Sequence, residues 1–297
     1  MKSGRITALV RRWWRSLVLV PVLAGAGAGC VSSVDTAAVT AAGGAYATAM
    51  NRLMLATGRV AVDTSSERLL QEELPASQPL EEYQRLAAAD ARRLDLLERL
   101  RDHNRLLGRY FALLGELTEA PEAVAIRERL QGISQALNET TAELRARPEF
   151  SPGEPGPSPA ARTLVLGGRR PDDELRRDAP RLRSAFRTQD VLLSGLVTGV
   201  RRDFEVIRQA QEQRLVIAPL LSQDAVKNPE PWTMARRELL LLAVTIRELE
   251  KAQLLADRLT VDVDALLEAG CGTADLRRLE EDAARLTAAC NGLANTR

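Results

Sequence analysis

Few side chains in this 297-residue sequence have the chemistry of a reactive or metal-binding group. The chain holds one histidine, His103, and three cysteines, Cys30, Cys271 and Cys290. A histidine-based zinc site needs further histidine or cysteine ligands close to His103, and a catalytic triad needs a nucleophile beside it. Neither arrangement is marked in the sequence. We therefore interpret His103 as a core residue bonded to one polar partner, and we assign no catalytic, metal or cofactor residue.

Sequence motifs of the common enzyme classes are missing as well. The glycine pair Gly167-Gly168 is not followed by the Lys-Ser/Thr of a phosphate-binding loop. Ser194 does not stand in a Gly-x-Ser-x-Gly turn. Runs of acidic or basic residues on helices are usually solvated faces. The sequence therefore predicts a protein that is not an enzyme and uses no cofactor.

Cys271 and Cys290 are the two cysteines in the C-terminal part of the chain. A disulfide is chemically allowed in an exported protein. A helix over residues 274–289 would hold its ends about 24 Å apart, whereas a disulfide needs Cα atoms within about 7 Å. We expect Cys290 to pack in the core as a small apolar residue and keep a disulfide between Cys271 and Cys290 as the alternative.

The first 29 residues have the layout of a secretory signal peptide. Residues 1–15 include five basic side chains and no acidic one, and residues 16–29 are uncharged and mostly apolar or small. This uncharged run is shorter than the roughly 20 residues that a membrane-spanning helix needs. We expect the chain to be exported and to lose residues 1–29.

Cys30 follows the leader directly, after Ala28 and Gly29. The sequence here resembles the lipobox of bacterial lipoprotein precursors, in which small residues precede a cysteine. The resemblance covers about 30 residues. It implies that Cys30 carries the lipid, is the mature N-terminus and attaches the chain to a membrane of the bacterial cell envelope. Val31 is not the Asp that retains such proteins in the inner membrane, so in a Gram-negative cell the resemblance implies the periplasmic face of the outer membrane.

Ordinary secretion is the alternative to lipid attachment. The tripeptides Ala24-Gly25-Ala26 and Ala26-Gly27-Ala28 both have the A-x-A form of a signal-peptidase site. Cleavage at either site would leave a soluble secreted periplasmic protein.

Charge and composition bear on partners and on fold class. Lysine and arginine total 41 against 40 acidic residues, so the chain offers no long-range attraction to nucleic acid. Aromatic residues are only 3%. The rest of the apolar content is mainly Ala and Leu, which favours helices over strands.

Apolar residues recur at steps of three and four along most of the mature chain, which predicts amphipathic helices. The clearest stripe consists of Leu86, Ala89, Arg93, Leu96, Leu100, His103, Leu107, Tyr110, Leu114 and Leu117. We expect six helices, at about 34–62 with a restart at the capping-box pattern of Thr64 to Glu67, 86–117, 123–144, 175–226, 233–266 and 273–293. Pro219 is expected to kink or end the helix over 175–226.

Residues 148–171 contain six prolines and four glycines, which predicts a linker or long loop. We divide the chain into a signal peptide (1–29), an N-terminal helical region (30–147), this linker (148–171) and a C-terminal helical region (172–297). The expected fold is all-α, an elongated antiparallel helical bundle of about six helices, formed as one bundle or two.

The leader, the helical stripes and the lack of catalytic motifs together favour one function. We expect a non-catalytic, membrane-anchored scaffold or adaptor that presents helix faces to a protein partner. The alternative is a carrier or sensor that binds an apolar ligand between helices.

Overall fold

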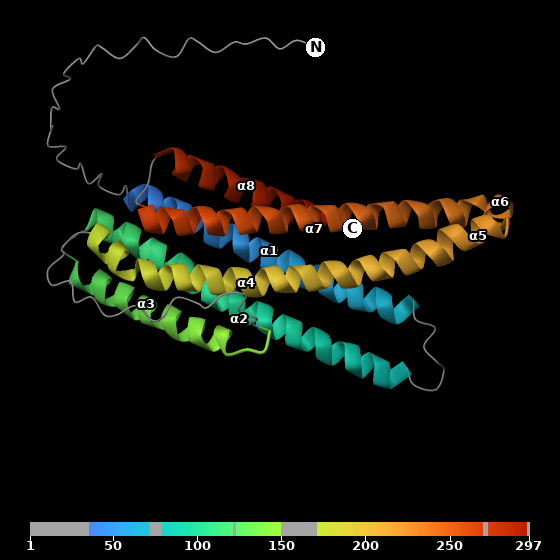
Figure 1. The fold of residues 1–297 in the computed structure, drawn as a ribbon, viewed down its shortest axis with the longest axis horizontal. Coiled ribbons are helices and arrows are strands. Elements are labelled where there is room, and N and C mark those ends of the chain that lie inside the picture. Colours follow the sequence, from blue (N-terminus) through green and yellow to red (C-terminus); the bar gives the residue numbers. More distant parts are fainter. Residues whose placement is uncertain (1–35, 72–78, 121–122, 150–170, 270–272, 296–297) are drawn as a thin grey trace, which may run out of the picture. The chain divides into compact units, whose positions relative to one another are not determined.

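The computed structural model describes residues 36–71, 79–120, 123–149, 171–269 and 273–295. In this part of the chain the regular secondary structure is helical, without strands (Figure 1). This confirms the all-α prediction. Six helices have 22 residues or more, the number expected: α1 (Thr36–Gln71), α2 (Pro79–Glu119), α3 (Val124–Arg145), α4 (Pro171–Gln211), α7 (Pro229–Ala269) and α8 (Thr273–Asn295).

Prolines mark the beginnings of three of these helices. Pro79, Pro171 and Pro229 are the first residues of α2, α4 and α7. Proline fits there because the first N–H groups of a helix have no partner within the helix. Helix α7 consequently begins four residues before the predicted start at Thr233. The hydroxyl of Thr233 donates to the carbonyl of Pro229, inside the first turn.

Helix α1 is more regular than the sequence predicts. The capping-box pattern predicts a restart at Thr64, but α1 continues without a break to Gln71. The hydroxyls of Thr64 and Ser66 donate to the carbonyls of Val60 and Val62, one turn earlier in the same helix. These side chains therefore bond within the helix instead of capping a new one.

The helix predicted over 175–226, with a kink or end expected at Pro219, is interrupted in this region, beginning a little earlier than expected. Helix α4 ends at Gln211 and is followed by three short segments: the π-helix η1 (Glu212–Ile217), α5 (Ala218–Leu221) and α6 (Asp224–Lys227). Pro219 has no N–H to continue the α-helical ladder. The N–H of Ala218 bonds the carbonyl of Gln213, five residues earlier, as in a π-helix. These segments form the tip of the hairpin that α4 and α7 make (Figure 1).

Consecutive long helices in each half pack against one another in opposite directions. Between α1 and α2, Asn104 bonds the carbonyl of Ala47 and Arg101 bonds Asn51, so residue numbers rise in one helix as they fall in the other. Figure 1 shows the same reversal for α4 and α7 and for α7 and α8. Helix α1 also packs against α4 and α8.

Helices from both sides of the predicted linker share one core. The ring of Tyr46 on α1 meets that of Phe186 on α4 edge to face, with centroids 4.7 Å apart. The ring of Phe111 on α2 lies 6.1 Å from the same Phe186. Burying each aromatic side chain contributes about 2–3 kcal/mol. These contacts hold the two halves of the chain together.

Several predicted features lie outside the described residues. They are the signal peptide with Cys30, residues 150–170 of the predicted linker, and Cys271. Among the helices that the structure describes, none combines the length and apolarity needed to cross a membrane.

Candidate functional site

His103 lies in the core between α2, α3 and α4 and has no exposed surface. Its Nδ1 is 2.7 Å from the hydroxyl of Thr140, and its Nε2 is 3.4 Å from the carbonyl of Ala185. Burial lowers the pKa of the imidazole to about 4, because the charged form loses its contact with water. The interpretation of His103 as a core residue with a polar partner is confirmed.

Cys290 on α8 is a free, buried thiol. Burial raises the pKa of this thiol to about 12, so the reactive thiolate is scarce near neutral pH. Cys290 therefore acts as a small apolar core residue. Cys271, the partner in the alternative disulfide, lies outside the described residues, and the lipid on Cys30 stays a prediction.

A cluster of polar side chains lies inside the bundle where α1, α2, α4 and α7 meet. The amide nitrogen of Gln189 donates to the Tyr46 hydroxyl and to Oδ1 of Asn104, each at 3.3 Å. The Tyr46 hydroxyl is 3.4 Å from that of Thr260. The Asn104 amide donates to the carbonyl of Ala47 at 2.6 Å. These bonds link four helices and fix their register.

This polar cluster was not predicted as a unit from the sequence. Gln189 stands out in the sequence as a polar residue in an apolar stripe. Its neighbours in the cluster do not, because Tyr46 and Thr260 are 214 residues apart in the sequence and meet only in the fold. Burial raises the pKa of the Tyr46 hydroxyl above its ordinary value, so this group stays a neutral hydrogen-bonding group. The cluster has the character of structural cross-links inside a core.

Two carboxyl groups continue the cluster at the interface of α4 and α7. Thr260 donates to Oδ1 of Asp190 at 3.2 Å. Burial, and then repulsion by Asp257, raise the pKa of Asp190 to about 7. Burial also raises the pKa of Asp257. The chemistry this arrangement supports is proton uptake near neutral pH within a helix interface. In the described part of the chain, no group of three or more His, Cys, Asp or Glu side chains is placed to hold a metal ion.

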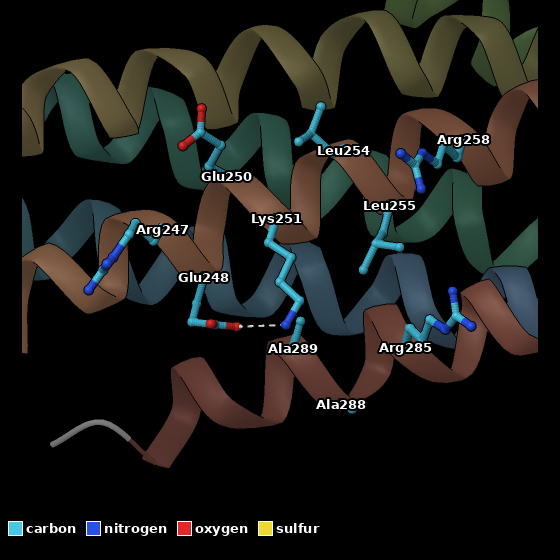
Figure 2. Close-up of a pocket in the computed structure, with 10 residues that line it drawn as sticks. All are labelled: Arg247, Glu248, Glu250, Lys251, Leu254, Leu255, Arg258, Arg285, Ala288 and Ala289. Atoms are coloured by element: carbon cyan, nitrogen blue, oxygen red, sulfur yellow. Dashed lines mark ion pairs between the residues drawn. The ribbon is translucent and has the colours of Figure 1, made fainter.

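A groove of about 690 Å³ lies on the outer side of α7 and α8. Figure 2 shows Leu255 pointing from α7 toward α8 and Leu254 pointing to the opposite side of α7. The small residues Ala288 and Ala289 of α8 leave space beside α7. We call this feature the α7–α8 groove, and it is lined by Arg247, Glu248, Glu250, Lys251, Leu254, Leu255, Arg258, Arg285, Ala288 and Ala289.

The α7–α8 groove combines uncovered apolar surface with a positively charged rim. Leu254 is 56% exposed. Four of the lining residues are basic and two are acidic. Both acids have cationic partners: Glu248 is 3.7 Å from the Lys251 ammonium, and Glu250 pairs with Arg201 of α4. The apolar stripe in the sequence does not point to these residues, because it marks the buried face of α7 rather than its outer face.

The fold and groove define an all-α bundle with a basic, partly apolar surface site. Comparison with protein-family models, with curated proteins and with solved structures finds no match to this chain.

Proposed function

We propose that this chain is a non-catalytic lipoprotein of the bacterial cell envelope, attached through lipid on Cys30, whose helical bundle is a scaffold or adaptor for a protein partner. In a Gram-negative cell its place is the periplasmic face of the outer membrane. The leader, with its short apolar run ending in Ala-Gly-Cys, supports the anchor. The α7–α8 groove supports the binding of a protein partner.

The observation that carries the proposal is uncovered apolar surface beside unpaired positive charge. Leu254 and Val261 on α7 are 56% and 66% exposed. Arg247 and Arg258 form no ion pair with any residue that the structure describes. Removing apolar side chains from water drives association, and charges at the rim select the partner.

A carrier of small apolar ligands is less well supported. Sites for such ligands are concave and bury most of the ligand. In the middle of this bundle the space is filled by Tyr46, Phe111 and Phe186, each at most 1% exposed. The α7–α8 groove is open, with Lys251 and Arg285 more than 60% exposed. An open surface of this kind suits a protein partner better than a small molecule.

The chain between anchor and bundle is short if Cys30 is the mature N-terminus. Thr36 begins α1 six residues later. Six residues extend to at most about 20 Å. A lipid on Cys30 would therefore attach the start of α1 to the membrane by a short segment. One acyl chain binds a membrane marginally, whereas two bind stably.

The proposed function is tested by photo-crosslinking in intact cells. A photoreactive amino acid replaces Lys251 in the α7–α8 groove, and in a matched control it replaces Glu128, which is exposed on α3. We expect the residue-251 variant, and not the residue-128 variant, to give a cross-linked species containing one other protein.

Two results would contradict the adaptor. One is equal cross-linking from residues 128 and 251, which would mean nonspecific contact. The other is the absence of a protein cross-link from residue 251 while the protein is present at its normal level.

A further inference from the structure

The outer face of α7 carries a stripe of exposed residues spaced seven apart. The stripe consists of Leu240, Arg247, Leu254 and Val261. The three apolar members are 58%, 56% and 66% exposed. A stripe of 21 residues is about 30 Å long. It therefore extends beyond the α7–α8 groove in both directions and offers three heptads of contact to another helix.

The charges beside this stripe are mostly positive and only partly neutralised. Lys251 pairs with Glu248 at 3.7 Å, and Arg285 pairs with Glu281 and Asp282 on its own helix. The pairs with Glu248 and Glu281 lie largely in solvent and contribute little energy, whereas Asp282 is buried. Arg247 and Arg258 have no ion pair within the described part of the chain. The carboxylates of a partner would therefore meet little competition from acidic residues of this chain for these basic side chains.

A second groove shows why the charge matters. It lies between α1 and α2, has a volume of about 610 Å³ and is also lined by exposed leucines. Its charged residues are two arginines and two acids: Arg59, Arg101, Asp63 and Glu98. That groove therefore carries no net charge. The α7–α8 groove has more basic than acidic residues, and this positive charge favours an acidic partner.

We propose that the α7–α8 groove binds an acidic amphipathic helix of a partner protein. This inference rests on the proposed adaptor function and names the chemistry of the partner. Apolar residues of the partner at steps of three and four cover Leu254 and the rest of the stripe, as in other helix-in-groove complexes. Glu or Asp residues beside them pair with Arg247, Lys251 and Arg258.

A helix fits this surface better than an anionic lipid does. The uncovered stripe is about 30 Å long, longer than one acyl chain in a bilayer leaflet, which spans half of a core about 30 Å thick. The groove is also open along its length, so it would leave much of an acyl chain in water. A helix buries its apolar stripe against α7 and leaves its polar face in solvent.

The test uses the full mature chain in detergent and a synthetic 21-residue helical peptide. The peptide has Leu at heptad positions a and d and Glu at e and g, and a matched peptide has Lys in place of every Glu. Binding is followed by fluorescence anisotropy of the labelled peptides. We expect the Glu peptide to bind at least tenfold more tightly than the Lys peptide, and its affinity to fall with added salt.

Charge reversal in the protein should reverse this preference. The double variant Arg247→Glu, Arg258→Glu is expected to bind the Glu peptide at least tenfold more weakly and to gain affinity for the Lys peptide. Leu254→Glu is expected to weaken binding similarly. The matched control is Leu94→Glu in the α1–α2 groove, where an exposed leucine is replaced in the same way and binding should not change.

Several outcomes would overturn the acidic-helix proposal. They are no binding of the Glu peptide, equal binding of both peptides, and binding that the double variant leaves unchanged. Self-association abolished by Leu254→Glu would show that a second copy covers the groove. Binding of anionic vesicles lost in the double variant, without peptide binding, would show a lipid surface. If residue 251 cross-links to a protein but the Glu peptide does not bind, the adaptor function would stand and the proposal of an acidic helical partner would be wrong.

Discussion

At the scale of single residues, two neighbouring glycines on α1 have opposite surroundings. A methyl group on Gly43 would lie 2.3 Å from Cγ of Phe111, whose ring is buried in the core. A methyl group on Gly44 would meet nothing within 4 Å. Gly43 therefore permits the close approach of α1 and α2, whereas Gly44 only weakens the helix.

Replacing each glycine by alanine separates these two effects. Gly43→Ala is expected to lower the free energy of unfolding by about 1–3 kcal/mol, because Phe111 must move in a packed core. Gly44→Ala is expected to raise it by up to about 1 kcal/mol, because alanine has the higher helix propensity. Urea denaturation followed by circular dichroism measures both. If the two variants were equally stable, the packing of α1 against α2 described above would be wrong.

Residue patterns predict the apolar core better than its polar contents. Leu100, Leu107 and Leu114 belong to the predicted stripe and are fully buried. Periodicity identifies them because burial of a helix face repeats every three or four residues. The bonds of Gln189 to Tyr46 and Asn104 depend on which helices become neighbours. No spacing within a single helix carries that information.

At the scale of helix pairs, Asp190 makes the packing of α4 against α7 sensitive to pH. Its pKa in the fold is about 7, compared with the ordinary 3.8, through burial and through repulsion by Asp257. Between these values the folded protein binds the proton more tightly than the unfolded chain does. The stabilising contribution of the protonated group is therefore complete below about pH 4 and is lost as pH rises through 7.

Asp190→Asn, which resembles the protonated acid, should remove this loss. We expect the variant to be more stable than the native chain at pH 8, by on the order of 2 kcal/mol, with a smaller difference at pH 4. Chemical denaturation at both pH values provides the comparison. If the native chain were as stable as the variant at pH 8, or more stable, the charged form of Asp190 would be well accommodated in the fold.

Helix boundaries were harder to predict than helix positions. Prolines interrupt the apolar pattern, but whether a proline begins or ends a helix depends on its position. Pro229 opens α7, since the first turn lacks N–H partners anyway. Pro219 follows a π-helix near the hairpin tip. The stripes identified the long helices because their buried faces are long, and they missed the π-helix because a single wide turn hardly changes an apolar pattern.

At the scale of the whole molecule, we expect the bundle to fold without the proposed anchor. The described helices begin at Thr36, and their shared core uses residues from α1 to α8. Sequence periodicity predicted an all-α bundle and left open one core or two. Composition alone could not decide, because a proline-rich segment can join two bundles or cross one. The aromatic contacts of Phe186 with Tyr46 and Phe111 join the halves.

Cys30→Ala tests the separation of anchor from fold. The variant is expected to keep the helical signal and melting temperature of the native chain, because residue 30 precedes the bundle. It should lose lipid, and then either remain uncleaved at the inner membrane or be cut at an A-x-A site and become soluble. Fractionation of cells, with circular dichroism of the purified variant, checks both parts. If the variant unfolded, residue 30 would be needed for the stability of the bundle.

The claim that the bundle works from a membrane surface is tested most directly by the mass of the mature N-terminus. Intact and peptide mass spectrometry of the protein purified from its own envelope should find Cys30 as the first residue, with a lipid group that carries two acyl chains attached to its thiol sulfur. Two or more acyl chains would hold the protein stably at the membrane. An unmodified N-terminus at Gly27 or Gly29 would contradict this and show a soluble secreted protein.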